Sequence, residues 1–465
     1  MDSNWPEVSI DELKASSKNA IAMGPFGSRI KVENFVEDGV PVIKGGNLTG
    51  DFIVEDKFDF LTEEKADELK ASNAFRRDIV ITHRGTIGQV GIIPDDSKFE
   101  RYVVSQSQLK VTLDQEKVNP YFIYYFLRSP VGQHRLLMNA SQVGVPAIAQ
   151  ASTSVKSIMV PYPEKEIQNK VVEIILGLDT KIHKNRQINQ TLETMAQAMF
   201  KSWFVDFEPV KAKIAAIEAG EDAEGVIRAA MSAISGKTDE ELDQLQAEQP
   251  EHYTQLKTTA ELFPSAMQDS ELGKVPDGWE ISNFGKVSTC FDKNRIPLSK
   301  RQREQKKGLI PYYGATSVMD YVDESIFDDI YLLLGEDGSV LKDDGSPFIQ
   351  YIWGKSWVNN HAHVLQGANG VSTEHLMLFM QSQNITAYVT GAVQLKLNQK
   401  NMNSIPFINA GKPINDAFYF SIAPFYAFKR NDEEEIKGLR NLSDILLPKL
   451  LSGELEVNAI NEAEG

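Results

Sequence analysis

The sequence predicts an internally duplicated protein with two domains of mixed helix and strand content and two long helices. The first observation is that seven residues between 144 and 199 recur later in the chain at one constant offset. The second is a pair of long apolar repeats, one before the middle of the chain and one near its end. A duplication of this size indicates approximate twofold symmetry, which suits a ligand with two halves, such as duplex DNA. The matching pairs are Gly144–Gly391, Val155–Met402, Ser157–Ser404, Ile158–Ile405, Leu192–Leu439, Met195–Leu442 and Met199–Leu446.

The bulk composition predicts a cytoplasmic protein. The chain has 465 residues, a length typical of about three domains. Its single cysteine, Cys290, excludes an internal disulfide framework. The N-terminus does not resemble a signal peptide, and no apolar run approaches the roughly 18 residues of a membrane span.

The net charge of −17 argues against DNA binding only at first sight. Residues 205–265 carry a net charge of roughly −8, and the tail after residue 430 is also acidic. The two candidate domains are each close to neutral. Since the local field of a domain governs contact with phosphate groups, either domain can still present a basic face.

Residues 1–160 are expected to form the first domain. Short apolar runs bounded by Gly, Pro or charged residues predict strands at 40–43, 79–82, 90–93 and 108–111. Asn119 and Pro120 have the residue types of an N-cap and a first helical position, so we expect a helix from there to Arg128.

Residues 164–204 are expected to form one long helix, because apolar residues recur mostly every three or four positions. Asn185 interrupts this seam, and some 40 residues make a rod roughly 60 Å long. A second seam near the C-terminus, which also contains Ile436, supplies a partner for an antiparallel coiled coil that holds the two domains apart. Besides Ile188, the predicted packing residues are Ile167, Val171, Ile174, Leu178, Ile182, Leu192, Met195, Met199, Leu439, Leu442, Leu446 and Leu450.

The remaining segments follow from composition and from the repeat. Glu- and Ala-rich runs predict short helices at 212–219 and 224–235 within an acidic insertion at 205–265. Residues 270–410 repeat the plan of the first domain, and both copies open on a tryptophan, Trp5 or Trp279. The second long helix is assigned to 413–455, followed by a flexible tail at 456–465.

Several motifs, in this order, resemble the DNA-specificity (S) subunits of type I restriction–modification systems. Residues 24–31 and 77–88 look like the opening loop and the central strand and turn of a target recognition domain. The segments 335–338 and 357–363 resemble a variant of the second such domain. The pattern is completed by 202–211, 391–398 and 447–454.

The resemblance implies two α+β target recognition domains that each read one half of a split DNA target. It also implies a non-catalytic chain that binds no cofactor. Two modification (methyltransferase) subunits would bring S-adenosylmethionine and methylate adenine, and restriction subunits would bring ATP and Mg for translocation and cleavage. The helical bundle, together with the acidic insertion, would be their docking surface.

Pro424 departs from the family pattern. A proline inside a helix removes a hydrogen bond and clashes with the preceding turn, at about 3 kcal/mol. We therefore expect the second long helix to start after Pro424 or to be kinked there.

The DNA contacts are predicted from basic residues and from side chains able to read bases. The densest basic cluster spans 293–307, and two tyrosines follow it. In the second domain the predicted residues are Lys293, Arg295, Lys300, Arg301, Arg303, Lys306, Lys307, Tyr312, Tyr313, Asn359, Asn360 and His361. In the first domain they are Arg29, Lys31, Lys44, Arg76, Arg77, Arg84, Gln106 and Gln108.

No metal site is predicted. His361 and His363 would share one face of a strand, but structural hydrogen bonding explains this polar run better because no Cys pair or acidic residue stands at ligand spacing. No catalytic site is predicted either. Asn119-Pro-Tyr-Phe122 lacks the second proline of an adenine methyltransferase loop, and the chain has no phosphate-binding glycine motif.

Two other function classes stay open at this point. A free-standing adenine DNA methyltransferase would need a cofactor loop and a catalytic loop. A coiled-coil scaffold that binds protein or glycan would show no salt-dependent retention on DNA.

Overall fold

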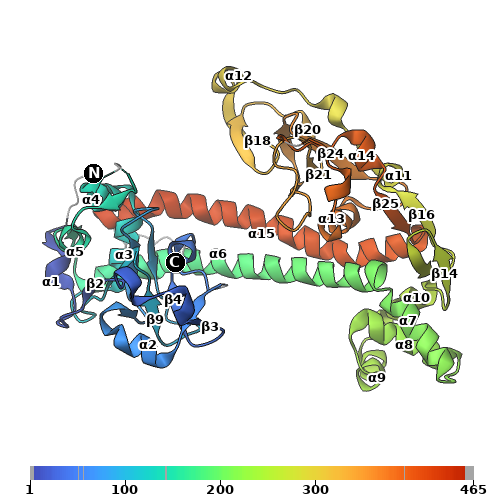
Figure 1. Cartoon of the computed structure of the whole chain (residues 1–465), viewed down its shortest axis with the longest axis horizontal. Coiled ribbons are helices and arrows are strands. Elements are labelled where there is room, and N and C mark those ends of the chain that lie inside the picture. The colour runs from blue at the N-terminus through green and yellow to red at the C-terminus, as the bar shows by residue number, and fades with distance from the viewer. Residues whose placement is uncertain (1–4, 51, 56, 142–143, 392, 456–465) are drawn as a thin grey trace, which may run out of the picture. The chain divides into compact units, whose positions relative to one another are not determined.

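The computed structural model describes residues 5–50, 52–55, 57–141, 144–391 and 393–455. The chain divides into two compact units. Unit 1 comprises the chain up to Asn185 together with the segment from Glu434 onward, and unit 2 is Arg186–Glu433. Two long helices, α6 (Lys165–Phe200) and α15 (Lys412–Ser452), contribute residues to both units (Figure 1). Each unit also holds one α+β domain, as predicted.

Unit 1 contains two sheets. A four-stranded antiparallel sheet has the order β2 (Ile21–Met23), β10 (Gln108–Val111), β7 (Ile79–Thr82) and β8 (Val90–Ile92). A five-stranded sheet has the order β3 (Phe35–Val36), β5 (Asp59–Leu61), β4 (Val40–Ile43), β9 (Tyr102–Val104) and β6 (Asn73–Ala74). All four strands predicted in this domain are present.

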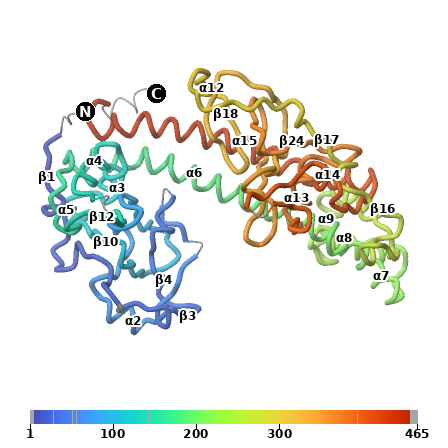
Figure 2. Tube along the Cα trace, turned by 45° about the horizontal axis from the view of Figure 1, so that its top comes forward, coloured from blue at the N-terminus to red at the C-terminus, as the bar shows by residue number. Residues whose placement is uncertain are grey.

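Helices cover both sheets of unit 1. The helix α3 (Pro120–Arg128) packs its aromatic face on the four-stranded sheet, and Asn119 caps it by accepting a hydrogen bond from the Tyr121 backbone N–H, as predicted. Ala66 of α2 (Glu63–Glu68) packs against Val40 and Val42 of the other sheet (Figure 2). The remaining elements are α1 (Ile10–Leu13), α4 (Pro130–Leu137), α5 (Ala151–Lys156), and the strand pairs β1 (Glu7–Ser9) with β13 (Met159–Pro161) and β11 (Ala140–Ser141) with β12 (Ala147–Ile148).

Unit 2 repeats the order of these two sheets except for β3, which has no counterpart in its second sheet. Its first sheet has the order β17 (Ser288–Cys290), β24 (Ala362–Gly367), β21 (Tyr331–Gly335) and β22 (Ile349–Ile352). Its second sheet has the order β19 (Val318–Val322), β18 (Lys307–Tyr313), β23 (Lys355–Val358) and β20 (Phe327–Asp328). The parallel pair β18–β23 corresponds to β4–β9 of unit 1.

The terminal parts of the second domain repeat as well. The pair β16 (Glu280–Asn283) and β25 (Pro406–Asn409) matches β1 and β13. The helix α13 (Thr373–Ser382) packs on its four-stranded sheet as α3 does in unit 1. The predicted internal duplication is therefore confirmed by topology. The remaining elements are α11 (Phe284–Val287), α12 (Lys300–Gln305), α14 (Gln399–Asn403), and the hairpin β14 (Met267–Ser270) with β15 (Gly273–Pro276).

The two long helices pack antiparallel within each unit. In unit 1, Asn185 of α6 donates a hydrogen bond to Glu435 of α15 at 2.7 Å, while Val171 and Leu450 share one core. In unit 2, Glu193 of α6 pairs with Lys429 of α15 at 2.8 Å. Residue numbers thus rise along one helix as they fall along its partner.

The predicted seam is wrong at three positions. Ile188, Met195 and Leu442 are 42%, 45% and 43% exposed, and Asn185, Asn189 and Ala196 are buried in the seam of α6 instead. The pattern of apolar residues alone does not fix which side of α6 faces α15, because the buried asparagines donate hydrogen bonds to glutamates of α15. The other predicted packing residues are buried or half-buried.

The expectation that the second long helix starts after Pro424 is also wrong. The helix α15 starts at Lys412, with Pro413 in its first turn, and runs through Pro424. Because proline has no N–H, the carbonyl of Phe420 loses its intrahelical donor. Both Pro424 and Phe420 are exposed, so water can satisfy that carbonyl.

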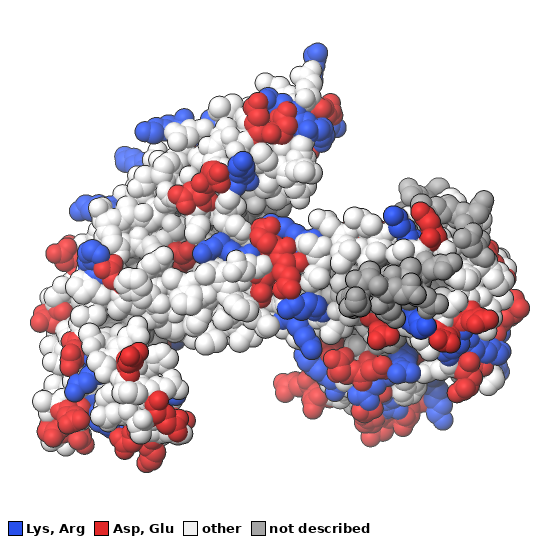
Figure 3. All heavy atoms as spheres, turned by 180° about the vertical axis from the view of Figure 1, so that it is seen from behind, with Lys and Arg blue, Asp and Glu red and all other residues white. Residues whose placement is uncertain are grey.

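The acidic insertion forms a small helical module in unit 2. Its helices are α7 (Glu208–Glu218), α8 (Ala223–Ser235), α9 (Asp239–Glu248) and α10 (Pro250–Leu262). They enclose their own core, which includes Met231, Leu242 and Tyr253. Figure 3 shows more acidic than basic side chains on the visible face of this module. Among the described residues, no helix has both the length and the apolar character needed to cross a membrane.

Candidate nucleic-acid interface

The candidate site of unit 1 lies where β7 ends and β10 begins. Thr82 and Gln108 are paired residues of these neighbouring strands. Directly beyond them, the His83 backbone N–H donates to the Ser107 carbonyl at 2.9 Å. Arg84 and Gln106 therefore emerge beside each other at the same edge of the sheet, and both side chains are exposed.

Backbone contacts fix the turn that carries Arg84. The Gly85 N–H donates to the Pro146 carbonyl at 2.8 Å, and Gly85 has a φ of 87°, a left-handed conformation that favours glycine. Ile148 donates in turn to the His83 carbonyl at 2.9 Å. The base of the Arg84 side chain is thus held by a rigid frame, which is what a base-reading group needs.

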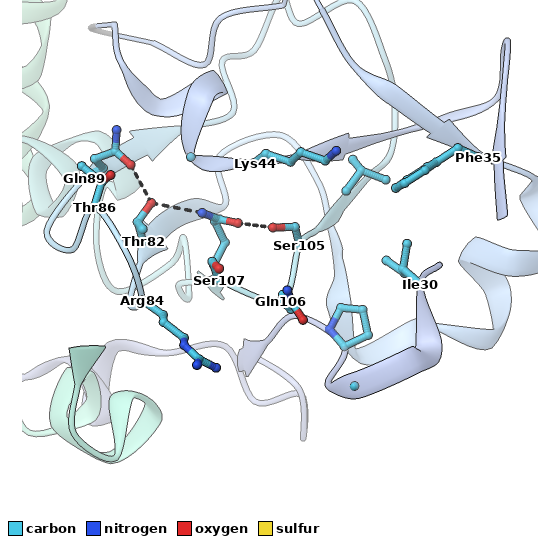
Figure 4. A pocket seen from close by; sticks show the side chains of 15 residues that line it. Ile30, Phe35, Lys44, Thr82, Arg84, Thr86, Gln89, Ser105, Gln106 and Ser107 are labelled. Atoms are coloured by element: carbon cyan, nitrogen blue, oxygen red, sulfur yellow. Dashed lines mark hydrogen bonds between the residues drawn. The ribbon is translucent and has the colours of Figure 1, made fainter. Parts of the chain in front are cut away.

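A cavity of about 420 Å³ opens at this edge. Arg84 and Gln106 lie at its mouth, and the loop around Pro25, Gly27 and Ile30 borders it (Figure 4). Its other lining residues are Phe35, Val42, Lys44, Gly45, Thr82, Thr86, Gln89, Ser105, Ser107 and Gln108.

A directed chain of hydrogen bonds crosses the cavity (Figure 4). Ser105 donates to Oε1 of Gln108, and Nε2 of Gln108 donates to Thr82 Oγ1 at 3.2 Å. Thr82 Oγ1 donates onward to Oε1 of Gln89 at 3.0 Å. Gln108 is 1% exposed with both ends of its amide engaged, so it supports the site and is not a DNA contact, contrary to the prediction.

The side chains of Arg84 and Gln106 are available to contact a ligand at this cavity. Neither makes a side-chain hydrogen bond with any residue in the described ranges. Arginine reads guanine O6 and N7, and glutamine reads adenine N6 and N7, in the major groove. Burial, with a contribution from the charge of Arg84, lowers the pKa of His83 beneath them, so His83 is neutral at pH 7.

Three other predicted cations of unit 1 are paired with acidic residues. Lys44 lines the cavity but forms an ion pair with Asp59. Arg76 pairs with Glu100 and Arg77 with Asp95, each at 2.7 Å, at the opposite end of β7 from Arg84. The structure therefore does not bring Arg76 and Arg77 to the cavity.

The loop that borders the cavity carries two further predicted residues. Arg29 ends the short helical turn Gly27–Arg29 and is exposed. Lys31 is exposed and lies 3.2 Å from Glu33. Of these two loop residues, Arg29 is the one with no acidic partner among the described residues.

Most of the basic cluster of unit 2 is neutralised within the unit. Arg303 pairs with Asp320 at 3.2 Å and stacks 5.1 Å from the ring centre of Tyr312. Lys307 also bonds Asp320, at 2.6 Å, and chiefly this bond lowers the pKa of Asp320 to about 2. Lys306 pairs with Glu324 at 2.8 Å.

Two predicted contacts in this region are wrong. Arg295 is largely buried, with Glu336 at 2.7 Å and Asp292 at 3.3 Å. Tyr312 is 1% exposed, and its hydroxyl accepts from the Leu298 N–H at 3.0 Å. Tyr313 is half-buried against the core of the second sheet.

Three cations of the cluster stay available. Lys293, Lys300 and Arg301 are exposed, and no acidic residue in the described ranges pairs with them. Lys300 and Arg301 start α12, which lies at the outer end of the second sheet of unit 2 (Figure 1). Cations at an exposed helix are suited to contact phosphate groups.

The polar run at 359–361 is split between interior and surface. Asn359 is buried, with its Oδ1 accepting from the His361 N–H at 2.8 Å, so the predicted DNA contact by Asn359 is wrong. Asn360 and His361 are exposed.

His363 takes part in a buried charge network. Its Nδ1 lies 2.5 Å from Asp292 and its Nε2 lies 2.7 Å from the Leu397 carbonyl. Burial, the largest single cause, lowers the pKa of His363. The bonds to Asp292, Cys290 and the Leu397 carbonyl, with the charge of Asp292, together outweigh it and raise the pKa to about 10. Cys290 lies close enough to Asp292 and His363 that the three side chains could together hold a metal ion. An imidazolium that donates from both nitrogens has no lone pair for a metal, so the geometry favours a salt bridge.

Sequence reasoning missed the supporting residues of both units. Gln89, Thr82 and Ser105 act through hydrogen bonds to partners far along the chain. Asp292 and Glu336 hold Arg295 and His363, yet the prediction found no acidic companion for the histidines. The constant offset of 247 residues between the two copies maps the turn at 83–88 onto 330–335. This falls a few residues short of the equivalent turn near 336–340, so the offset locates the region and not the residues.

Comparison with known proteins places the chain in a family. The model of the type I restriction modification DNA specificity domain matches residues 5–194 and 276–408. The unmatched stretch between them contains the acidic helical module.

Two curated relatives span most of this chain. The type I restriction enzyme HindI specificity subunit of Haemophilus influenzae is 32% identical over 392 residues, which cover 77% of this chain and 83% of the relative. The MjaIX specificity subunit of Methanocaldococcus jannaschii is 20% identical over 421 residues, covering 86% and 82%.

A solved structure shares the fold. The S subunit of a type I restriction–modification system from M. genitalium aligns with a TM-score of 0.54 and 16% identity, covering 97% of this chain and 96% of that one. Together with the two matched segments, these similarities show that the chain belongs to the family of type I restriction–modification DNA specificity proteins.

Proposed function

We propose that this chain is the specificity subunit of a type I restriction–modification complex and reads a split DNA target, one half with each unit. The observation that carries the proposal is the pair Arg84 and Gln106, exposed at the mouth of a polar cavity on a rigid turn. The two side chains are suited to guanine and adenine, respectively. Family membership supports the same conclusion.

We assign the methylation and the cleavage of DNA to other polypeptides. Two modification subunits would supply S-adenosylmethionine and methylate adenine, and restriction subunits would supply ATP-driven cleavage with Mg. Large apolar residues exposed on the long helices, including Phe420, Phe428 and Ile445, suit docking of such subunits. The complex is expected to act in the cytoplasm.

The long helices are proposed to set the gap between the two half-sites. Both α6, with 36 residues, and α15, with 41 residues, continue unbroken from one unit into the other. At about 1.5 Å per residue, each helix is long enough to span one turn of the DNA duplex, about 34 Å.

Replacing Lys300 and Arg301 together with alanine is expected to weaken DNA binding uniformly across sequences. The logarithm of the binding constant falls linearly with the logarithm of the salt concentration, and each lost phosphate contact makes this slope shallower by about 1. The measurement is fluorescence anisotropy of the chain assembled with its modification subunit, on a labelled duplex, over a salt series. Arg303 is left unchanged because it has a structural role.

The matched control replaces Lys211 and Lys274 with alanine, since both are exposed lysines of unit 2 outside the basic cluster. This control should keep the wild-type slope. Binding of the wild-type complex that does not depend on salt would contradict the proposed function. An unchanged slope in the Lys300/Arg301 variant would remove α12 from the interface.

A further inference from the structure

The turn that presents Arg84 in unit 1 has an exact backbone counterpart in unit 2. The Glu336 N–H donates to the His361 carbonyl at 2.8 Å, as His83 donates to Ser107. The Leu397 N–H donates to the Glu336 carbonyl at 2.9 Å, as Ile148 donates to His83. The two turns therefore make the same backbone hydrogen bonds, although their sequences differ.

Further contacts extend the match. The Gly338 N–H donates to the Leu395 carbonyl at 2.9 Å, and Gly338 has a φ of 80°, which repeats Gly85. Asp337 forms an isolated bridge with Lys396, as Arg84 does with Ala147. These positions of unit 1 thus have defined equivalents in unit 2. Arg84 corresponds to Asp337, Gln106 to Asn360, Ser107 to His361, and Ala147 to Lys396.

The side chains at these equivalent positions differ in charge. The cation of unit 1 is Arg84, but its equivalent in unit 2 is an acid, Asp337. The positive charge there comes from the facing strand, because Lys396 Nζ lies 3.4 Å from Oδ1 of Asp337. The side chain of Asp337 is 18% exposed and that of Lys396 is 49% exposed, so the acid orients the ammonium group of a lysine that is still half-exposed.

The backbone of Lys396 is fixed as firmly as that of Arg84. Lys396 and Thr390 exchange both backbone hydrogen bonds, at 2.7 and 2.8 Å. Lys396 is therefore held beside Asp337. The preceding residue, Glu336, is bonded to His361, and both Asn360 and His361 are exposed.

We propose that Asn360, His361 and Lys396 form the base-contacting site of unit 2, with Asp337 as the residue that positions Lys396. This inference rests on the proposed function. Lysine suits guanine O6 and N7, and asparagine suits adenine N6 and N7. The site is equivalent to that of unit 1 in backbone, but its cation projects from the facing strand instead of from the turn. The guanine of the second half-site is therefore expected at a different position relative to the adenine, so the two half-sites differ in sequence.

The test is Lys396→Ala in the full chain, co-expressed with its modification subunit, followed by mapping of methylated adenines on genomic DNA. We expect preference at one guanine position, in one half of the motif, to fall about tenfold, with the other half unchanged. Asp337→Asn should relax the same position without lowering the thermal midpoint of the chain. Lys400→Ala is the matched control, because Lys400 is an exposed lysine on α14 that lies outside the site.

Each outcome decides between the proposals. A wild-type complex that methylates no defined motif would contradict the proposed function itself. A defined motif that Lys396→Ala leaves unchanged would contradict only this inference. If Lys396→Ala abolishes methylation, the purified complex is titrated with duplexes that carry each base at each position. Loss of discrimination at one position then supports base contact, and a uniform loss of affinity shows a phosphate contact instead.

Discussion

Replacing Asp292 with alanine is expected to lower the free energy of unfolding of unit 2 by about 3–5 kcal/mol. The carboxylate lies between His363, at 2.5 Å, and Arg295, at 3.3 Å, and it also accepts from the Val364 N–H at 3.0 Å. Removing it leaves two buried cations that share Glu336 alone, and breaking a buried ion pair costs about this amount.

Urea unfolding followed by tryptophan fluorescence measures this loss. Four of the five tryptophans belong to unit 2, so the signal reports mainly on that unit. Asp343→Ala is the control, because Asp343 is an exposed turn residue of the same unit and should change stability by less than about 0.5 kcal/mol. Equal unfolding midpoints for the two variants would contradict the buried network.

The same network gives a pH dependence whose sign is fixed. The pKa of His363 is raised to about 10 in the folded chain, from an ordinary value of 6.5. Its contribution to stability is therefore complete below pH 6.5 and is lost as pH rises towards 10. Wild type should lose more stability than His363→Gln over this range, and parallel pH profiles would contradict the assignment of an imidazolium.

Lengthening both long helices by one heptad is expected to widen the gap between the two half-sites. A copy of residues 182–188 is inserted after Ile188, and a copy of residues 430–436 after Ile436. Each insertion adds two turns and about 10.5 Å while keeping the phase of the seam. The gap should grow by about three base pairs, or recognition should be lost, when methylated sites are mapped.

Two comparisons make this insertion informative. An insertion in α6 alone shifts Asn185 and Glu193 away from Glu435 and Lys429, so it should destabilise the chain. The double insertion restores these pairs and should unfold at nearly the wild-type midpoint. A folded double variant that methylates the original motif with its original gap would contradict the role of the helices as a spacer.

Local patterns predicted the elements of this fold well. Asn119 and Pro120 start α3 because capping depends on neighbouring residues only. The long helices followed from their apolar period. The phase of the seam did not, because Asn185 and Asn189 become buried only through glutamates of a helix some 240 residues away in sequence. The start of α15 was misjudged for a similar reason, since only the structure shows that Pro424 faces solvent within the helix.

The candidate site was less accessible to sequence reasoning. The basic run at 293–307 suggested one DNA-binding cluster, but Asp320, Glu324 and Glu336 neutralise four of its cations from distant positions. Arg84 and Gln106 were among the predicted residues, but Lys396 was not. The equivalent residue in unit 1 is Ala147, which has no polar group and so did not mark this position as part of the site. Equivalent positions become visible only when the two backbones are compared.

The most direct test of the two-domain account is the mapping of methylated adenines in cells that express this chain with its modification subunit. The account predicts a motif of two unlike halves separated by an unspecified gap. The double variant Arg84→Ala/Gln106→Ala should make one half degenerate and leave the other half intact. A single uninterrupted motif, or relaxation of both halves in that variant, would contradict the account.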